Sequence, residues 1–236
     1  MPDRYFVDKP LAAGIAIVAG DEARHLVGVM RAKVGDEVVL FDGCGHEADA
    51  TIEKTAKERV ELRVETVRDV PREFASQLTL AVALPKGDRQ KWLVEKLVEL
   101  GCDALLPLET DRGVAQPVES AIERLKRGVL EASKQSGRAL LMRIEAPASS
   151  DTLFSAATVH NQPCFIAHPG GCSLDQAWDQ SSGNALFAIG PEGGFSDREV
   201  QLAEQAGFQK VSLGPTILRI ETAAIAIAAL RMLRSS

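Results

Sequence analysis

The chain has 236 residues, 45% hydrophobic and 25% charged, which is typical of a globular protein and excludes a largely disordered one. A formal net charge of −6 argues against nonspecific nucleic-acid binding by the whole surface, although residues 121–150 carry six Lys/Arg against three Asp/Glu and allow a local basic patch. The longest apolar run, 223–230, is too short to span a bilayer, and no leader-like segment opens the chain. We therefore expect a cytoplasmic protein with no membrane partner.

The cysteines are scattered, with no C-x-x-C spacing and no paired histidines, which argues against a disulfide framework or a zinc site. We expect four buried free thiols and no bound metal. The cysteines are Cys44, Cys102, Cys164 and Cys172.

Short β-type segments, several with apolar and polar residues in alternation, fill the first part of the chain. The expected strands are 15–18, 37–41, 48–52 and 59–64, with a helical segment at 21–31. A small β-barrel domain over 1–72 is the predicted structure, because closure of a sheet removes its exposed edges. The polar, proline-bearing stretch 69–73 has the character of a linker.

From Leu78 onward, apolar strands alternate with amphipathic helices. The run 78–84 is apolar throughout, as expected of a strand buried on both faces, and Asp88 is in place to cap a helix over 89–100. Strands are then expected at 104–108, 140–144, 164–168, 185–189 and 211–213, and helices at 122–135, near 153, at 174–178, 197–206 and 223–233. This alternation predicts an α/β domain over 73–236, with a mainly parallel sheet covered on both faces.

Three glycine-bearing loops follow late strands: 167–171, 190–194 and 213–218. Ser196 and Glu199 form a predicted capping box just after the second of these loops, with Phe195 and Val200 as its hydrophobic staple. Loops at the carboxyl ends of strands in an open α/β sheet are where ligands bind, because backbone N–H groups there can face a ligand. The ligand expected is a small molecule with an adenine or ribose.

Common nucleotide, esterase and zinc-protease motifs are absent from the sequence: G-x-G-x-x-G after the first strand of the α/β part, G-x-x-x-x-G-K-[ST], G-x-S-x-G and H-E-x-x-H. Each remaining feature also has a structural interpretation. Gly193-Gly194 fits a tight turn, His168 fits a structural histidine, and the apolar final helix fits a core or subunit interface. Arg219 and Glu221 stand out, because charges beside a buried helix are costly unless they are paired or used.

Two late motifs together resemble the signature of the small-subunit ribosomal RNA methyltransferase E family. They are Ile189-Gly190-Pro191-Glu192-Gly193-Gly194-Phe195-Ser196, and Leu213-Gly214-Pro215-Thr216-Ile217-Leu218-Arg219-Ile220-Glu221-Thr222-Ala223. Further matches run along nearly the whole chain: Arg4-Tyr5-Phe6, Met30-Arg31, Lys86-Gly87, Glu95 to Gly101, Thr110-Asp111-Arg112 and Gln135 to Arg138. Thr216 stands where relatives commonly have arginine, and Ile220 where threonine is usual, which weakens the expectation of an RNA contact at 216.

The resemblance implies a PUA-like β-barrel followed by a methyltransferase domain of the SPOUT superfamily with a carboxyl-terminal trefoil knot. It implies methylation of a uridine at N3 in 16S rRNA, with the small ribosomal subunit or its rRNA as partner and S-adenosylmethionine as methyl donor, without a metal. It also implies a homodimer, in which the apolar final helix fits a role at the interface.

The same resemblance carries expectations for individual residues. The expected cofactor-binding residues are His168, Pro169, Gly190, Pro191, Glu192, Gly193, Gly194, Leu213, Gly214, Ile217, Leu218, Arg219 and Thr222. Glu221 or Glu192 is expected to handle the proton and Arg219 or Arg138 to stabilise the uracil oxygens. The expected phosphate contacts are Arg4, Arg31, Lys86, Arg89, Lys91, Arg112 and Arg138.

Two alternatives remain at this point. In the first alternative, the methyl acceptor is another atom, such as a ribose 2′-hydroxyl or an atom of another base, as in other members of the superfamily. In the second, the chain is a non-catalytic ribosome-binding module.

Overall fold

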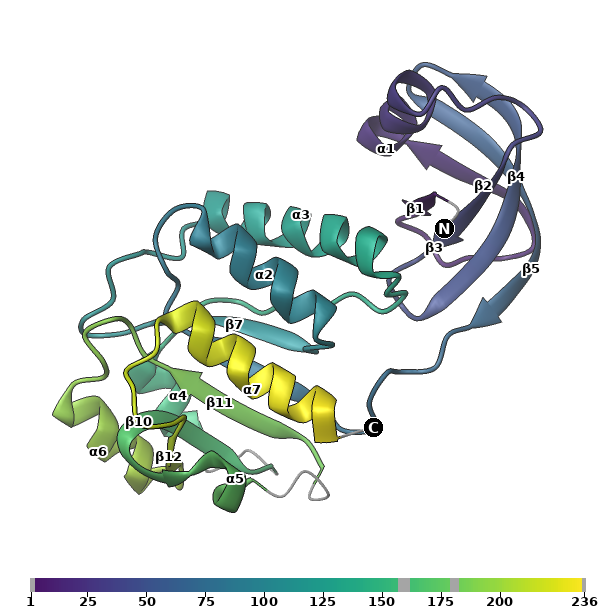
Figure 1. Ribbon diagram of the computed structural model, residues 1–236. Coiled ribbons are helices and arrows are strands. Elements are labelled where there is room, and N and C mark those ends of the chain that lie inside the picture. Colours follow the sequence, from purple (N-terminus) through teal and green to yellow (C-terminus); the bar gives the residue numbers. More distant parts are fainter. Residues whose placement is uncertain (1–2, 157–161, 179–182, 235–236) are drawn as a thin grey trace. The chain divides into compact units, whose positions relative to one another are not determined.

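The computed structural model describes residues 3–156, 162–178 and 183–234 (Figure 1). The chain forms two compact units. The first comprises Met1–Arg72 with Leu130–Leu141, and the second Glu73–Val129 with Met142–Ser236. The division of the chain into domains 1–72 and 73–236 stays a prediction.

The first unit contains a five-stranded sheet in the order β1-β3-β4-β5-β2, in which only β1 and β3 run parallel. All four predicted strands are present, and a fifth, at 4–6, is too short to show a periodic pattern. Instead of one helix at 21–31, the chain forms a short α-helix and then a π-helical turn. The bounds are β1 (Arg4–Phe6), β2 (Gly14–Ala19), α1 (Gly20–Arg24), η1 (His25–Val29), β3 (Glu37–Phe41), β4 (His46–Ala56) and β5 (Arg59–Asp69).

The core of this unit follows from the alternation in its strands. Val60, Leu62 and Val64 of β5 are buried together with Leu26 of η1 and Ile52 of β4. Successive side chains in a strand point to opposite faces, so the charged residues that alternate with these three in β5 point to the other face.

The turn between β3 and β4 forms hydrogen bonds with a segment that follows α3 (Glu119–Ser136). The N–H of Gly45 donates to the carbonyl of Ala139 over 3.2 Å, and that of Leu141 donates to the carbonyl of Gly43 over 3.0 Å. The predicted strand 140–144 is therefore wrong in its first half, because the backbone there pairs with the turn of the first unit. Only Arg143–Ile144 joins the sheet of the second unit, as β8.

The second unit contains a parallel sheet in the order β12-β10-β11-β6-β7-β8, with β9 also paired to β7. The predicted parallel α/β sheet is confirmed. Its strands are β6 (Leu78–Val82), β7 (Ala104–Glu109), β8, β9 (Ala148–Ser149), β10 (Cys164–Ser173), β11 (Ala185–Ile189) and β12 (Gln209–Ser212).

Helices cover this sheet on both faces (Figure 1). On one face, Leu186 and Ala188 of β11 share a core with Phe154 of α4 and Ala203 of α6. On the other face α7 packs against β6, β11 and α2. The helices are α2 (Arg89–Glu99), α3 (Glu119–Ser136), which runs on into the first unit, α4 (Ser150–Ala156), α5 (Leu174–Ala177), α6 (Asp197–Gln205) and α7 (Ile220–Arg234).

The predicted cap of α2 is wrong. Asp88 has helical backbone angles, φ −64° and ψ −17°, and its side chain makes no capping hydrogen bond. The expectation of four buried thiols is half right, since Cys102 and Cys164 are buried but Cys44 and Cys172 are exposed. Burial raises the pKa of the Cys164 thiol to about 11, which makes it inert at neutral pH. Within the described parts of the chain, no helix is long and apolar enough to cross a membrane.

Candidate functional site at the carboxyl ends of the parallel strands

The candidate site lies where the connections of the parallel sheet change direction. Strands β6 and β11 are neighbours, but β6 leads to β7 on one side, whereas β11 leads to β12 on the other. Ligands in open α/β sheets bind outside the carboxyl ends of the strands at such a switch point. The loop 83–88 and the turn 190–194 both begin at this point, where the N–H of Ala83 donates to the carbonyl of Ile189 over 2.9 Å.

The turn after β11 needs its glycines. A Cβ atom at Gly190 would lie 2.9 Å from the ring of Phe195, closer than real Cβ contacts come. Gly194 has a φ of +68°, in the left-handed region that other residues rarely adopt. The predicted capping box follows at once and is confirmed: Ser196 Oγ accepts from the N–H of Glu199, and the Glu199 carboxylate accepts from the N–H of Ser196.

The predicted loop at 167–171 does not follow the end of a strand but interrupts one. Ala167 and Cys172 both pair with Val211 of β12, so the four residues between them, 168–171, bulge out of β10. A Cβ atom at Gly171 would lie 2.5 Å from the backbone of Val211, which leaves no room for a side chain. Within the bulge, His168 Nδ1 accepts from the N–H of Gly170 over 3.1 Å.

The third loop joins β12 to α7. Gly214 has a φ of +127°, and Ser212 Oγ donates to its carbonyl over 3.2 Å. Ile217 is 87% exposed, and Arg219 is exposed at the end of the loop. The final helix begins at Ile220, three residues before its predicted start, and Glu221 thereby lies in its first turn, where a negative charge is favourable.

One guanidinium connects three segments of this edge. Arg89, the first residue of α2, donates from Nη2 to Glu192 Oε1 over 2.9 Å. Its Nη1 lies 3.6 Å from Glu221 Oε2. Arg219 and Glu221, neighbours in the second motif, thus have different environments: Glu221 faces Arg89 and is buried, whereas Arg219 is exposed.

The two candidate proton acceptors differ in their environments. The pKa of Glu192 is held below its usual value, first by a hydrogen bond from its own backbone N–H and then, against partial burial, by Arg89 and Lys86. The Glu221 side chain is only 5% exposed. Among the residues that the structure describes, no donor forms a hydrogen bond with its Oε2 atom.

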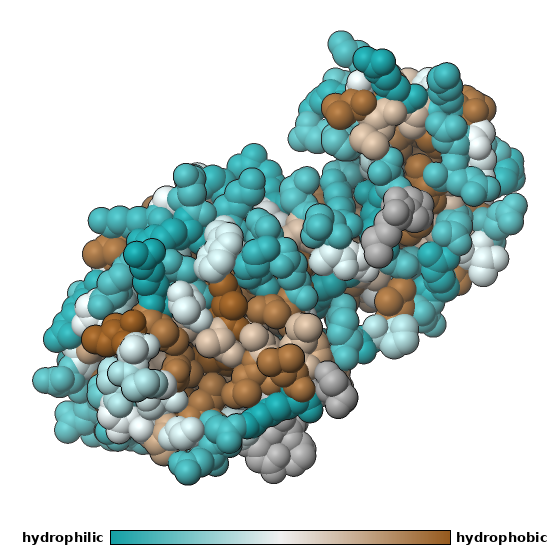
Figure 2. Space-filling model, in the orientation of Figure 1, coloured by the Kyte–Doolittle hydropathy of each residue, from teal (hydrophilic) through white to brown (hydrophobic). Residues whose placement is uncertain are grey.

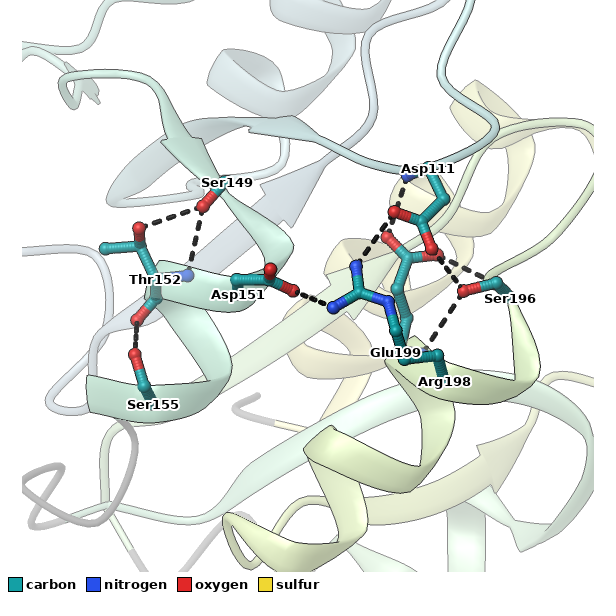
Figure 3. Close-up of polar contacts among 8 residues, drawn as sticks. All are labelled: Asp111, Ser149, Asp151, Thr152, Ser155, Ser196, Arg198 and Glu199. Carbon is teal, nitrogen blue, oxygen red and sulfur yellow. Dashed lines mark hydrogen bonds and ion pairs between the residues drawn. The ribbon is translucent and has the colours of Figure 1, made fainter.

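The loop after β7 contacts the start of α6 (Figure 3). Asp111 donates its N–H to Glu199 Oε1 over 3.0 Å, and its carboxylate accepts from Ser196 Oγ at 2.6 Å and Arg198 Nη2 at 2.9 Å. Arg198 also reaches Asp151 of α4, over 2.8 Å. The pKa of Asp111 is lowered by these hydrogen bonds, from Arg198 first and then Ser196, so its carboxylate is ionised at neutral pH.

Arg112 supports the same turn from the other side. Its Nη1 donates to the carbonyl of Gly193 over 2.9 Å and to that of Phe195 over 3.4 Å. Sequence reasoning assigned Arg112 to a phosphate and missed Asp111 altogether, although both belong to the Thr110-Asp111-Arg112 motif. Their position just after a buried strand was the available signal.

The remaining expected RNA contacts are distributed over both units. In the first unit, Arg4 is largely buried, pairs with Glu47 and lies 5.1 Å from the centre of the Phe41 ring. Arg31 is exposed with an unusual φ of 55°, whereas Arg138 is only 5% exposed. In the second unit, Lys86 and Lys91 are exposed, and the charge of Lys86 acts on Glu192 of the candidate site.

Comparison with known proteins agrees with this fold and site. Residues 72–232 match the family model of an RNA methyltransferase domain, and residues 18–65 match that of an RNA methyltransferase PUA domain. The molecule is therefore an RNA methyltransferase with an amino-terminal PUA domain.

Individual relatives show to which family of RNA methyltransferases the chain belongs. The chain is 35% identical to ribosomal RNA small subunit methyltransferase E of Synechocystis sp. over 91% of its own length and 72% of that protein. It is 32% identical to the protein of the same name from Bacillus subtilis, over 87% and 85% of the two chains. The chain belongs to the ribosomal RNA small subunit methyltransferase E family.

Two solved structures share the whole fold. A methyltransferase from Legionella pneumophila, in complex with S-adenosylmethionine, superposes with a TM-score of 0.91 at 28% identity, over 99% of this chain and 98% of that one. A ribosomal RNA small subunit methyltransferase E from Neisseria gonorrhoeae, bound to S-adenosylmethionine, has a TM-score of 0.90 at 28% identity and the same coverage.

Proposed function

We propose that the protein methylates N3 of a uridine in 16S rRNA of the small ribosomal subunit, in the cytoplasm, with S-adenosylmethionine as methyl donor. The observation that carries this proposal is the edge of the parallel sheet where three glycine-bearing segments gather beside a buried carboxylate, in a chain whose relatives are ribosomal RNA methyltransferases. The trefoil knot of the superfamily stays a prediction.

The residues present fit the proposed methyl donor. S-adenosylmethionine carries positive charge on its sulfonium and amino groups, and the buried Glu221 carboxylate supplies negative charge at this edge of the sheet. The glycine turns offer backbone groups without obstructing side chains. The residues proposed to hold the cofactor are His168, Pro169, Gly190, Pro191, Glu192, Gly193, Gly194, Leu213, Gly214, Ile217, Leu218, Arg219 and Thr222.

The chain's own residues must align the uridine, exclude water and remove a proton. Uracil N3 carries a proton and is a poor nucleophile until that proton is lost, so a general base or an electrostatic substitute is required. Glu221 and Glu192 are the candidate bases, and Arg219 and Arg138 the candidates to stabilise the uracil oxygens. The target uracil must also leave its stack in the RNA to reach such a site.

RNA contacts are proposed on the exposed cations Arg31, Lys86 and Lys91. Replacement of one of them by glutamine should weaken rRNA binding and reduce its salt dependence by about one counterion, without loss of cofactor binding. The other expected contacts, Arg4, Arg89, Arg112 and Arg138, are each buried or engaged with protein groups, so their replacement would also disturb the fold around them.

A homodimer is proposed through the outer face of α7. This face is apolar and partly exposed, with Met232 42% and Leu233 73% exposed at its end. Figure 2 shows apolar residues gathered over this part of the second unit. Leu233→Asp should shift the protein from dimer to monomer in analytical ultracentrifugation.

Two measurements test the proposed function. Calorimetry should detect binding of S-adenosylmethionine to the purified protein. No binding at millimolar ligand would contradict the proposed methyltransferase activity and favour a ribosome-binding module. Mass spectrometry of nucleosides from rRNA of a deletion strain, before and after treatment with the protein, should show N3-methyluridine only after treatment. If the modified nucleoside carries a 2′-O-methyl ribose or another methylated base, the assignment of uracil N3 as the acceptor atom is wrong.

A further inference from the structure

Arg89 joins two carboxylates that come from distant parts of the chain. It lies at the start of α2, whereas Glu192 follows β11 and Glu221 is the second residue of α7. The contacts are a hydrogen bond of 2.9 Å to Glu192 Oε1 and an ionic contact of 3.6 Å to Glu221 Oε2. A planar guanidinium can reach two acceptors at once, which an ammonium group does less well.

The two carboxylates have different capacity left to accept a proton. Glu192 is 41% exposed and already accepts from Arg89 and from its own N–H. Glu221 is 5% exposed, and its Oε2 has a cation nearby but no hydrogen-bond donor within the described parts of the chain. Buried polar atoms are satisfied in most proteins, so an exception of this kind in a strand-end site points to a group that meets its partner in the complex.

We propose that Arg89 is a positioning residue for methyl transfer, which keeps Glu221 ionised and in place so that Glu221, rather than Glu192, accepts the N3 proton of the uridine. This inference rests on the proposed function. The step balances: the N3 proton passes to Glu221 Oε2, the N3 lone pair bonds the methyl carbon, and the carbon–sulfur bonding pair stays on the neutral sulfur of the product. The proposal reassigns Arg89, which the sequence suggested as a phosphate contact.

The physical basis is compensation of a buried charge. An ionised carboxylate away from water is costly unless a cation offsets it, and Arg89 is that cation for Glu221. At 3.6 Å it offsets the charge without occupying Oε2 as a hydrogen-bond donor. Two other charged groups belong to this arrangement. Glu192 after β11 is the second carboxylate at Arg89, and Lys86 in the loop before α2 acts on Glu192. Loss of Arg89 would therefore favour the protonated form of Glu221, which cannot act as a base.

A kinetic experiment compares Arg89→Gln, Arg89→Lys, Glu221→Gln and Glu192→Gln in the full-length protein, with small ribosomal subunits or 16S rRNA as substrate. Glu221→Gln should lower kcat by about 100-fold or more, the usual contribution of a general base. Arg89→Gln should lower kcat at neutral pH by about tenfold and recover activity as pH rises, while Arg89→Lys retains part of it. Glu192→Gln should change the KM for the methyl donor and keep the wild-type pH profile.

Lys96→Gln is the matched control. Lys96 lies on the same helix and also joins two carboxylates, Glu95 at 3.0 Å and Glu99 at 2.8 Å, but it lies outside the proposed site. Its replacement should leave kcat and the pH profile unchanged. If Arg89→Gln behaves like Lys96→Gln, or if Glu192→Gln abolishes turnover while Glu221→Gln does not, the proposal is overturned.

A second readout does not depend on turnover. Carbon-13 NMR of glutamate-labelled, cofactor-free protein can follow the Glu221 carboxyl, identified by its loss in Glu221→Gln. The chemical shift of this carboxyl at neutral pH should change in Arg89→Gln and less so in Arg89→Lys, while Lys96→Gln leaves it unchanged. A chemical shift that does not respond to Arg89 overturns the inference even if the protein methylates rRNA. Wild-type protein that transfers no methyl group would instead refute the proposed function, with the Arg89–Glu221 coupling still decided by NMR.

Discussion

The two units differ in what their charged contacts join. In the first unit, many pairs connect neighbouring strands across a solvated face, as Arg63 does with Glu53 and Arg68 with Asp49. Lys134 with Glu22 is one of the exceptions. In the second unit, the contacts at the strand-end loops join residues far apart in sequence, by 103 positions for Arg89 with Glu192 and by 88 for Asp111 with Glu199. Charges that cover a sheet are mostly replaceable, whereas charges that connect strand-end loops shape a site.

The largest expected difference between the units concerns Arg231. This residue of α7 is 1% exposed, donates to Asp103 Oδ2 over 3.0 Å and lies 4.4 Å from the centre of the Phe74 ring. Arg231→Ala should cost about 3–5 kcal/mol, because Asp103 is left as a buried charge without this partner. Arg63→Ala in the first unit should cost less than about 1 kcal/mol. Urea unfolding of both variants measures the difference, and equal losses would refute the contrast.

A second expected difference between the two units concerns glycine residues whose backbone lies close to another strand. Gly171→Ala should destabilise the second unit by about 1–3 kcal/mol and weaken S-adenosylmethionine binding, because the new methyl group would meet the backbone of β12 at 2.5 Å. Gly28→Ala in the first unit is the control, since a Cβ atom there meets nothing within 4 Å. Thermal unfolding and calorimetry measure the two effects. Unchanged cofactor affinity in Gly171→Ala would argue against a role for the bulge in binding.

A smaller effect is expected for the helix cap beside the glycine turn. Ser196→Ala removes the acceptor for the N–H of Glu199 and the donor to Asp111, and helix caps of this type contribute about 1 kcal/mol. The variant should fold and should bind the methyl donor less tightly, because the turn loses one of its supports. Ser196→Thr keeps the hydroxyl and should behave like the wild type. Stability by urea unfolding and affinity by calorimetry distinguish the two variants.

The last expected effect depends on pH and concerns Asp42 in the first unit. Burial by itself raises the pKa of this carboxyl, but hydrogen bonds from the N–H of Cys44, from His46 and from the N–H of Leu11 outweigh it and hold the pKa below the usual 3.8. A lowered pKa in the folded state means that the stabilisation is complete above the unfolded value and is lost as pH falls through the folded one. Asp42→Asn should flatten the loss of stability below about pH 4. An acid limb identical to that of the wild type would contradict this assignment.

Much of the fold was readable from local patterns. The short β-type segments of β2 to β5, the apolar runs of β6 and β11 and the capping box at Ser196 each depend on residues close in sequence, and all of them are confirmed. Two predictions failed because a distant segment competed for the backbone. Residues 139–141 pair with the turn 43–45 instead of extending β8, and β12 pairs on both sides of the bulge in β10.

The sequence by itself determined which loops carry glycine, which charges stand beside them and which family the motifs resemble. Only the tertiary structure decided which charges meet: Arg89 lies between Glu192 and Glu221, and Arg112 holds the carbonyls of the glycine turn. The reason is physical. Parallel strands bring their carboxyl ends together through an order that differs from the order of the chain, so partners about a hundred positions apart leave no local pattern to read.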